Sequence, residues 1–182
     1  ELTSLCISLT MDAGASIRLN EVNGMRFTTQ IDVDQLEAFE ALGGKLVAQG
    51  TLIAPTDSVA YTELNHSLPE RTYLDVKGNP YGFYQNKTGK IAGSIVSIKD
   101  ANIPREFIGR GYITVKLGDM QKTIYATAND SSRSIKYIAR CVFEDETVMP
   151  NYSNAQKEQV LIWMNYMPDA EIKDPSKEDN FD

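Results

Sequence analysis

The segments Gly14-Ala15-Ser16-Ile17-Arg18-Leu19 and Asn23-Gly24-Met25-Arg26-Phe27-Thr28-Thr29-Gln30-Ile31 decide the fold that the sequence predicts. Apolar and polar residues alternate in both, which is typical of strands that bury one face of a sheet. The dipeptide Asn23-Gly24 is a strong hairpin signal, because both residues accept the positive φ angles of a tight turn. We therefore predict two strands, over residues 16–19 and 25–31, joined by residues 20–24.

Each of these strands carries one arginine between apolar neighbours, Arg18 in the first and Arg26 in the second. Such an arginine either faces solvent on the polar side of the sheet or pairs with a carboxylate. We predict a partly buried ion pair for Arg26, so Arg26→Ala would cost about 3 kcal/mol or more by stranding the partner charge. The carboxylate of Asp57 is a candidate partner for Arg18, Arg26 or Arg110.

The rest of the chain shows the same kinds of pattern. Helix starts are indicated by side chains that cap the backbone, such as the capping-box pair Ser153 and Gln156, followed by apolar residues at helical spacing. Gly43-Gly44 ends the first helix after Leu42. The predicted helices begin at Asp32 or Asp34, near Asp130 or Ser131, and at Ser153; the predicted strands cover residues 5–9, 45–55, 91–98, 107–117 and 122–128.

The order of these elements predicts an α+β fold, because strands come first in the chain and helices last. We expect an antiparallel β-sheet or a sandwich-like core, packed by a short central helix and two C-terminal helices. Residues 1–168 are assigned to a single globular domain, and residues 169–182, rich in carboxylates and prolines, to an acidic tail or linker. Residues 56–90 are polar and irregular, and form either a functional loop or several short strands.

Composition limits the classes of partner. Asp and Glu outnumber Lys and Arg by 25 to 18, and the basic residues are scattered, which argues against nucleic acid. No apolar run approaches the ~18 residues of a membrane-spanning helix. The chain begins without Met, and we interpret it as an excised or processed segment. Cys6 and Cys141 either form a bridge or stay as buried free thiols, the interpretation that we favour.

Catalytic chemistry has few candidate residues. His66 is the only histidine, no cysteine pair has metal-ligand spacing, and no nucleophile-elbow or phosphate-loop motif is present. We therefore predict no metal, no cofactor and no enzymatic activity. A glycosidase-like pair of carboxylates is an alternative, with Asp57, Glu63 and Asp75 as its candidates.

Aromatic residues in the irregular region are the strongest functional signal. An exposed aromatic ring stacks on the apolar C–H face of a sugar, and nearby polar groups fix the orientation of the ligand. The alternative is that residues 81–84 form a short strand with Phe83 buried. The predicted ligand-binding residues are the aromatic Tyr61, Tyr73, Tyr81, Phe83 and Tyr84, and the polar Asp75, Asn79 and Gln85.

Several motifs resemble those of a known group of modules. They are Gly14 to Arg18, Gly24 to Thr28, the run Gly50-Thr51-Leu52-Ile53-Ala54-Pro55-Thr56-Asp57, and Arg110-Gly111-Tyr112 together with Ser132-Arg133-Ser134-Ile135. In these motifs the chain resembles the non-catalytic modules of secreted multi-domain surface and cellulosome-type proteins of anaerobic Gram-positive bacteria. The resemblance implies an extracellular location, secreted or attached to the cell surface, and no catalytic residues.

Together these observations predict a non-catalytic extracellular binding module, with plant polysaccharide as its ligand and neighbouring modules of the same protein as further partners. A structural or protein-docking module is the first alternative, with an apolar patch around Trp163, Tyr166 and Met167 packed on an adjacent module. A glycoside-active enzyme that uses a carboxylate pair is the third interpretation.

Overall fold

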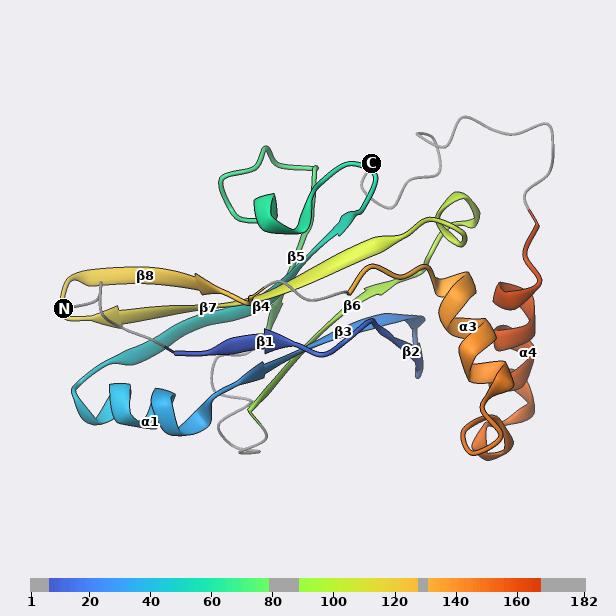
Figure 1. The fold of residues 1–182 in the computed structure, drawn as a ribbon, viewed down its shortest axis with the longest axis horizontal. Helices are drawn as coiled ribbons and strands as arrows, with labels where there is room; N and C mark the ends of the chain where they lie inside the picture. Colours follow the sequence, from blue (N-terminus) through green and yellow to red (C-terminus); the bar gives the residue numbers. More distant parts are fainter. Residues whose placement is uncertain (1–6, 79–88, 128–130, 168–182) are drawn as a thin grey trace.

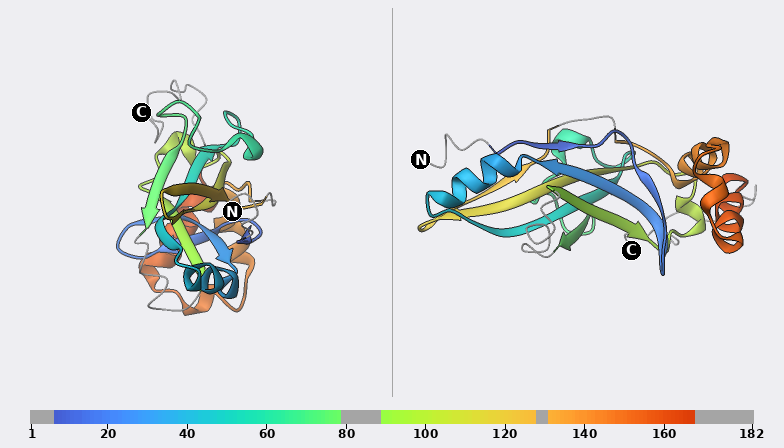
Figure 2. Two further views of the ribbon diagram at one scale, coloured as in Figure 1. Left: turned by 90° about the vertical axis from the view of Figure 1, so that its left-hand side faces the viewer. Right: turned by 90° about the horizontal axis from the view of Figure 1, so that it is seen from below.

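The computed structural model describes residues 7–78, 89–127 and 131–167 of the chain. In these ranges the strands form two antiparallel four-stranded sheets, and α-helices lie at the two ends of the long strands (Figures 1 and 2). The core lies between the sheets, which face each other. This arrangement confirms the predicted α+β fold with an antiparallel sheet core.

The first sheet is built around β3, the strand that follows the predicted hairpin turn. Leu19 pairs with Asn23 and Ser16 pairs with Arg26, which confirms the hairpin. The predicted turn at Asn23-Gly24 is wrong: residues 20–22 make the turn, whereas Asn23 and Gly24, neither with a positive φ, already lie in β3, which begins at Asn23 rather than Met25. β1 and β2 lie along one edge of β3, and β6 lies along the other. The strands of this sheet are β1 (Leu9–Met11), β2 (Ser16–Leu19), β3 (Asn23–Ile31) and β6 (Lys90–Val96).

The second sheet has the strand order β5-β4-β7-β8. Its central strands occupy the predicted ranges, and Gly118, with a φ of 60°, makes the tight turn into the last strand. β5 lies at the edge within the region whose sequence shows no clear periodicity. The strands are β4 (Lys45–Pro55), β5 (Leu74–Gly78), β7 (Phe107–Leu117) and β8 (Met120–Tyr125).

Glycines allow the two sheets to approach each other closely. Gly109 and Gly111 of β7 lie against the side chains of Phe27 and Thr29 of β3, with no space for a Cβ. The sheets also join at one edge, where the N–H of Thr127 donates a hydrogen bond to the carbonyl of Leu9 (3.0 Å). The core between the two sheets includes the fully buried side chains of Met25, Phe27, Ile53, Ile113 and Val115.

The helices begin at the capping side chains. Asp32 accepts the N–H of Gln35 ahead of α1 (Val33–Ala41), and the capping box of Ser153 and Gln156 precedes α4 (Asn154–Met164), as predicted. α3 (Ile135–Glu144) begins after Ser134, later than predicted, because Arg133 is still paired with Phe107 of β7.

The two ends of the molecule differ in their helices. α1 lies at one end of the strands, and α3 and α4 pack on each other at the opposite end, beside β2 (Figures 1 and 2). None of the helices in the described ranges is long and apolar enough to cross a lipid bilayer. Residues 169–182, which the sequence predicts to be a tail, lie outside the described residues.

Candidate functional site

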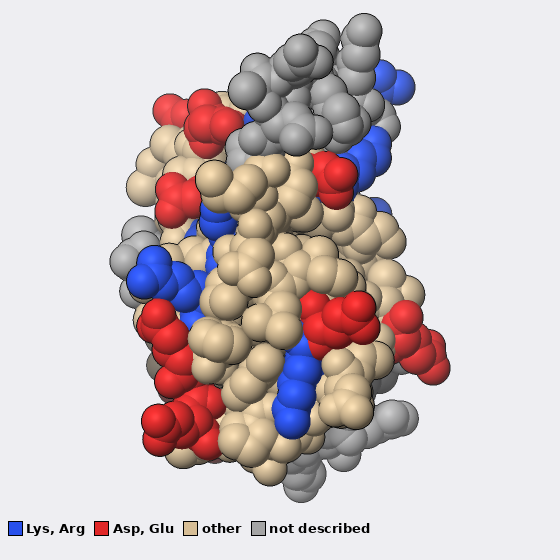
Figure 3. Space-filling model, turned by 90° about the vertical axis from the view of Figure 1, so that its right-hand side faces the viewer, with Lys and Arg blue, Asp and Glu red and all other residues tan. Residues whose placement is uncertain are grey.

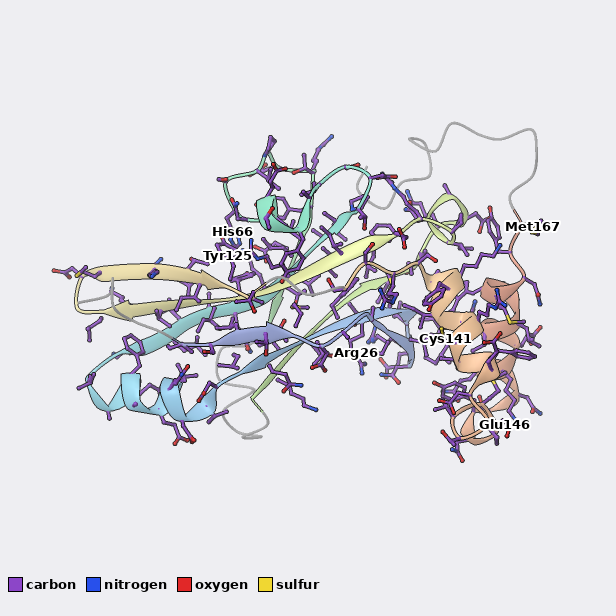
Figure 4. The ribbon with its side chains drawn as sticks, viewed as in Figure 1. Arg26, His66, Tyr125, Cys141, Glu146 and Met167 are labelled. Atoms are coloured by element: carbon purple, nitrogen blue, oxygen red, sulfur yellow. The ribbon has the colours of Figure 1, made fainter. Side chains whose placement is uncertain are left out.

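The face of the second sheet that points away from the first sheet carries a group of aromatic and polar side chains. We call it the tyrosine–histidine cluster and define it as His66, Tyr73, Asp75, Tyr112 and Tyr125. Tyr112 and Tyr125 are register partners on β7 and β8, Asp75 is on β5, and His66 and Tyr73 precede β5. Figure 4 shows His66 and Tyr125 side by side under the segment that leads from β4 to β5.

A glycine on β4 lets Tyr112 reach Asp75. Gly50 is the register partner of Tyr112, and a Cβ at this position would lie only 2.7 Å from the Tyr112 hydroxyl oxygen. Because Gly50 has no side chain, the Tyr112 side chain extends across β4 to the edge strand β5. There its hydroxyl donates a hydrogen bond to Oδ1 of Asp75 (2.7 Å).

His66 connects Asp75 to Tyr125. Its Nε2 lies 3.1 Å from Oδ2 of Asp75, and its Nδ1 lies 2.6 Å from the Tyr125 hydroxyl, which also accepts the His66 backbone N–H at 3.1 Å. An ionised carboxylate only accepts hydrogen bonds, so Nε2 donates to Asp75, and in the neutral ring Nδ1 accepts from Tyr125. The imidazole also stands perpendicular to the Tyr112 ring, with centroids 4.6 Å apart. These contacts hold Asp75 and His66 in one geometry.

Arg110 anchors the segment that carries His66. This half-buried side chain of β7 donates from Nε to the carbonyl of Ala126 (3.0 Å) and from Nη1 to the carbonyl of Leu64 (3.2 Å). Its guanidinium also lies over the rings of Tyr61 and Tyr125, 5.2 and 5.1 Å from their centroids. Arg110 therefore fixes the backbone on which the cluster rests, and the rings of Tyr61 and Tyr125 cover its guanidinium group.

Tyr73 is the member of the cluster that is open to a ligand. It is half-buried, and no described residue forms a hydrogen bond with its hydroxyl. Burial and the nearby charge of Asp75 raise the pKa of Tyr73, so the hydroxyl keeps its proton and can donate. The side chains of His66 and Asp75 are 34% and 21% exposed beside it, and the carboxylate oxygens of Asp75 have lone pairs to spare. The surface thus combines an aromatic ring, a donor and an acceptor.

Tyr112 predicts a specific loss of stability at alkaline pH. Burial, followed by the hydrogen bond to Asp75 and its charge, raises the pKa of Tyr112 well above the value of about 10 expected in the unfolded chain. Above pH ~10 the unfolded chain therefore loses this proton while the folded protein keeps it, and the free energy of unfolding falls by up to about 1.4 kcal/mol per pH unit. Denaturant titrations at each pH measure the difference in the free energy of unfolding between the wild type and Tyr112→Phe.

That difference in unfolding free energy should be constant from pH 7 to 9, where both states hold the proton. It should then shrink as the pH rises from about 10 to 11.5. A difference that stays constant through pH 11.5 would show that the Tyr112 hydroxyl titrates at its ordinary value.

The structure brings together part of the predicted ligand-binding set. Tyr73 and Asp75 belong to the cluster, whereas Tyr61 lies beneath it, with its hydroxyl donating to the carbonyl of Thr127 (2.8 Å) and its ring covered by Arg110. The Tyr61 hydroxyl is thus already engaged by the backbone. The remaining predicted residues lie outside the described ranges: Asn79, Tyr81, Phe83, Tyr84 and Gln85.

Three members of the cluster were not among the predicted ligand-binding residues: His66, Tyr112 and Tyr125. Tyr112 and Tyr125 fit the alternation of their strands, and Gly118-Asp119 indicates the turn between these strands, but the sequence does not give the register that sets the two tyrosines opposite each other. His66 lies in a polar stretch of sequence without clear periodicity, and its pairing with Asp75 depends on the path of the loop. The alternation of Arg110 and Tyr112 on one face of β7 is the signal that could have indicated this site.

The acidic residues proposed for a glycosidase pair are in different settings. Arg105, rather than Arg18, Arg26 or Arg110, pairs with Asp57, with Nη2 3.0 Å from Oδ1 and Nε 3.1 Å from Oδ2. The hydrogen bond from Arg105 lowers the pKa of Asp57, the opposite of what a general acid needs. No ion pair joins Arg26 to another residue of the described ranges.

Other reactive groups are few in the described part of the chain. Cys141 is a free thiol on the exposed side of α3, not buried as predicted, and Cys6 lies outside the described residues. Among the described residues, no three His, Cys, Asp or Glu side chains are grouped so that they could hold a metal ion.

Comparison of the chain with protein-family models, with curated proteins and with solved structures found no match. The geometry of the tyrosine–histidine cluster is therefore the basis on which a function is assigned.

Proposed function

We propose that this protein is a non-catalytic, extracellular binding module that holds a plant polysaccharide on the tyrosine–histidine cluster. One observation carries the proposal: the half-buried Tyr73, whose hydroxyl bonds to no other described residue, lies beside the partly exposed Asp75 and His66. The ring offers a surface for the C–H face of a sugar. The hydroxyl and the carboxylate offer a donor and an acceptor for sugar hydroxyl groups.

The rigidity of the cluster favours binding. Tyr112 and Tyr125 hold Asp75 and His66 through hydrogen bonds of 2.7 and 2.6 Å, and Arg110 holds the segment behind them. A surface whose side chains are already ordered loses little conformational entropy when a ligand arrives. An open platform of this kind suits a long polymer, because the ligand extends beyond the contact on both sides.

A non-catalytic role agrees with the state of the carboxylates. A glycosidase needs one carboxyl group with a raised pKa as its acid. Asp57 has a lowered pKa, and both carboxylate oxygens of Asp75 are already engaged, one by the Tyr112 hydroxyl and the other by the His66 imidazole. The proposed extracellular, cellulosome-type context rests on the motif resemblance. Two of those motifs fall on β4 and β7; β7 carries Tyr112 of the cluster, and Gly50 of β4 makes room for its side chain.

Tyr73→Ala should abolish polysaccharide retention. Removing the ring takes away the stacking surface and one donor, so the affinity should fall at least tenfold, equivalent to about 1.4 kcal/mol. Affinity gel electrophoresis against soluble starch, xylan, β-glucan, mannan and pectin identifies the ligand and measures the loss. Circular dichroism checks that the variant is folded.

The matched control is Tyr137→Ala, which removes an exposed tyrosine from α3 at the other end of the molecule. It should retain the wild-type mobility shift. Equal retention by Tyr73→Ala and the wild type would reject this cluster as the binding surface. Release of oligosaccharides from any of the polymers would reject the non-catalytic assignment.

The apolar surface of α3 and α4 favours docking to another module as a second function. The predicted centre of that patch is wrong in one respect, because Trp163 is buried at 5% exposure and belongs to the core. The exposed apolar side chains at this end include Phe143, Leu161, Ile162 and Met167 instead. Figure 3 shows an uncharged area on this end of the molecule, bordered by both acidic and basic groups. Docking would be favoured if the protein binds an adjacent module, if Ile162→Asp abolishes this binding, and if no polysaccharide is retained.

A further inference from the structure

The outer face of the first sheet carries a hollow between two arginines. About 370 Å³ in volume, it is lined by Arg18, Arg26, Val76, Ala92, Ser94 and Val96. Arg26 projects from β3 near the hairpin to β2 (Figure 4). Val76 reaches the hollow from β5 at the edge of the second sheet, and alternation along β5 turns it away from its neighbour Asp75 of the tyrosine–histidine cluster. No part of the proposed function uses this hollow.

The register of the strands explains why both arginines face this hollow. Alternate residues of β3 point to the same face, so Gly24, Arg26 and Thr28 point outward while Met25 and Phe27 enter the core. Arg26 has a serine opposite it on each side, Ser16 on β2 and Ser94 on β6.

Arg18 lies in the next row of the same face. Its register partner is Gly24, which places Arg18 diagonally to Arg26 and within reach of its long side chain. The residue opposite Gly24 on the other strand is Val96. Small side chains therefore form the floor between two guanidinium groups.

These two guanidinium groups keep donors for a ligand. Arg18 gives one hydrogen bond, from Nη1 to the carbonyl of Val22 (2.9 Å), which orients it and leaves its other N–H groups. Arg26 is half-buried and forms no hydrogen bond or ion pair with any other described residue. Asp12 lines a smaller hollow on the other side of Arg26, where its Oδ1 accepts a hydrogen bond from Gln30. Two like charges side by side in a chain with a net charge of −7 mark a local site for an anion.

We propose that this hollow binds the carboxylate of an acidic sugar, a uronate unit of an anionic polysaccharide. Arginine recognises a carboxylate through paired N–H donors, and the hydroxyl of Ser94 matches a sugar hydroxyl. Val76 and Val96 provide apolar contact for the C–H groups of the ring. The choice of a sugar as the carrier of the carboxylate rests on the proposed carbohydrate-binding function, whereas the recognition of an anion does not.

The strand pairing at the hollow limits which backbone groups a ligand can reach. β3 is paired on both sides, with β2 and with β6, so its backbone has no edge to offer. Among the described strands β6 and β5 each keep one unpaired edge, the kind of edge with which an extended peptide pairs. The comparison with triglutamate below therefore separates a peptide from a sugar. A volume of about 370 Å³ is in the range of small-molecule sites.

Isothermal titration calorimetry with trigalacturonate tests the proposal on the whole chain. Arg26→Gln should weaken binding at least tenfold, because a charge-assisted pair of hydrogen bonds is lost, and added salt should weaken wild-type binding. Arg140→Gln, which removes the same charge from the exposed surface of α3, should bind like the wild type. Arg26→Gln should fold normally, because no described residue depends on Arg26 as a partner.

The other outcomes separate the proposals. Equal weakening by Arg26→Gln and Arg140→Gln would overturn the site in favour of general charge attraction. Binding of triglutamate as tight as that of trigalacturonate would overturn the sugar assignment. Suppose that the wild type retains a neutral polysaccharide, that Tyr73→Ala abolishes this retention, and that trigalacturonate does not bind. This result would overturn the uronate site and leave the proposed function standing. If trigalacturonate binds through Arg26 but Tyr73→Ala changes no retention, the tyrosine–histidine cluster is rejected instead.

Discussion

Gly111→Ala should destabilise the protein by about 3 kcal/mol or more, because a methyl group does not fit between the two sheets. A Cβ on Gly111 would collide with Oγ1 of Thr29, and Thr29 is fully buried on β3. Neither backbone can easily move away. The carbonyl of Gly111 accepts the N–H of Ala126 (2.8 Å), and both its N–H and the Thr29 hydroxyl contact the sulfur of Met11.

The backbone of Gly111 does not have a positive φ, so the expected cost is steric rather than conformational. For a chain of this size, a loss of 3 kcal/mol lowers the melting temperature by roughly 6–12 °C. Differential scanning calorimetry measures the shift.

The matched control is Gly78→Ala on β5. A Cβ at Gly78 would meet only the flexible side chain of Gln49, at 3.3 Å, and the change also reduces the entropy of the unfolded chain. Its effect should stay within about 0.5 kcal/mol of the wild type. A Gly111→Ala variant as stable as Gly78→Ala would show that the sheets are not in close contact at this point.

Arg110→Ala should have the second large effect, again about 3 kcal/mol or more. The change removes the donors for the carbonyls of Ala126 and Leu64, two fully buried residues, and the cation that lies over two tyrosine rings. Each hydrogen bond from a charged donor contributes about 1.5–3 kcal/mol, and a cation–π contact about 0.5–2 kcal/mol. Chemical denaturation measures the stability, and hydrogen exchange of residues 61–68 should become faster.

Arg140→Ala is the matched control for Arg110→Ala. Arg140 is 69% exposed and makes one ion pair, with Glu144 on the same helix (3.1 Å), so its loss should cost under about 0.5 kcal/mol. Arg110→Lys should recover only part of the stability, because an ammonium lacks the planar fork that serves several carbonyls. A cost below about 1 kcal/mol for Arg110→Ala would mean that water replaces the guanidinium at these carbonyls.

The hairpin shows how much of the fold the sequence predicts. Alternation on β2 and β3 is a local property, and it correctly indicates both strands. The Asn-Gly dipeptide indicates a hairpin here, but not its turn, because Asn23 and Gly24 are already paired in β3 and have no positive φ. The capping box of Ser153 is also local, and α4 begins where it predicts. The start of α3 was predicted too early because the pairing of Arg133 with Phe107, a contact between distant residues, keeps the chain extended up to Ser134.

The candidate site was predicted less completely for the same reason. Aromatic residues near Asp75 pointed to the correct region, yet the partners of Asp75 come from three separate parts of the chain. The ion pair expected between Asp57 and Arg18, Arg26 or Arg110 forms with Arg105 instead, because Arg105 lies beside the end of β4 after folding. Charge alone does not identify a partner when several arginines are available.

The sequence by itself determined most of the strands, the capped helices and the α+β class, because periodicity and caps act between residues close in the chain. It did not give β5, and it placed the first strand over residues 5–9, whereas β1 covers Leu9–Met11. Only the tertiary structure decided which faces of the two sheets meet, and it did so through side-chain volume, as the contact of Gly111 with Thr29 shows. It also decided that His66, Asp75, Tyr112 and Tyr125 form one network, and that Arg18 and Arg26 face one hollow. Both results depend on strand register and loop path, which bring distant residues together only when the whole chain has packed.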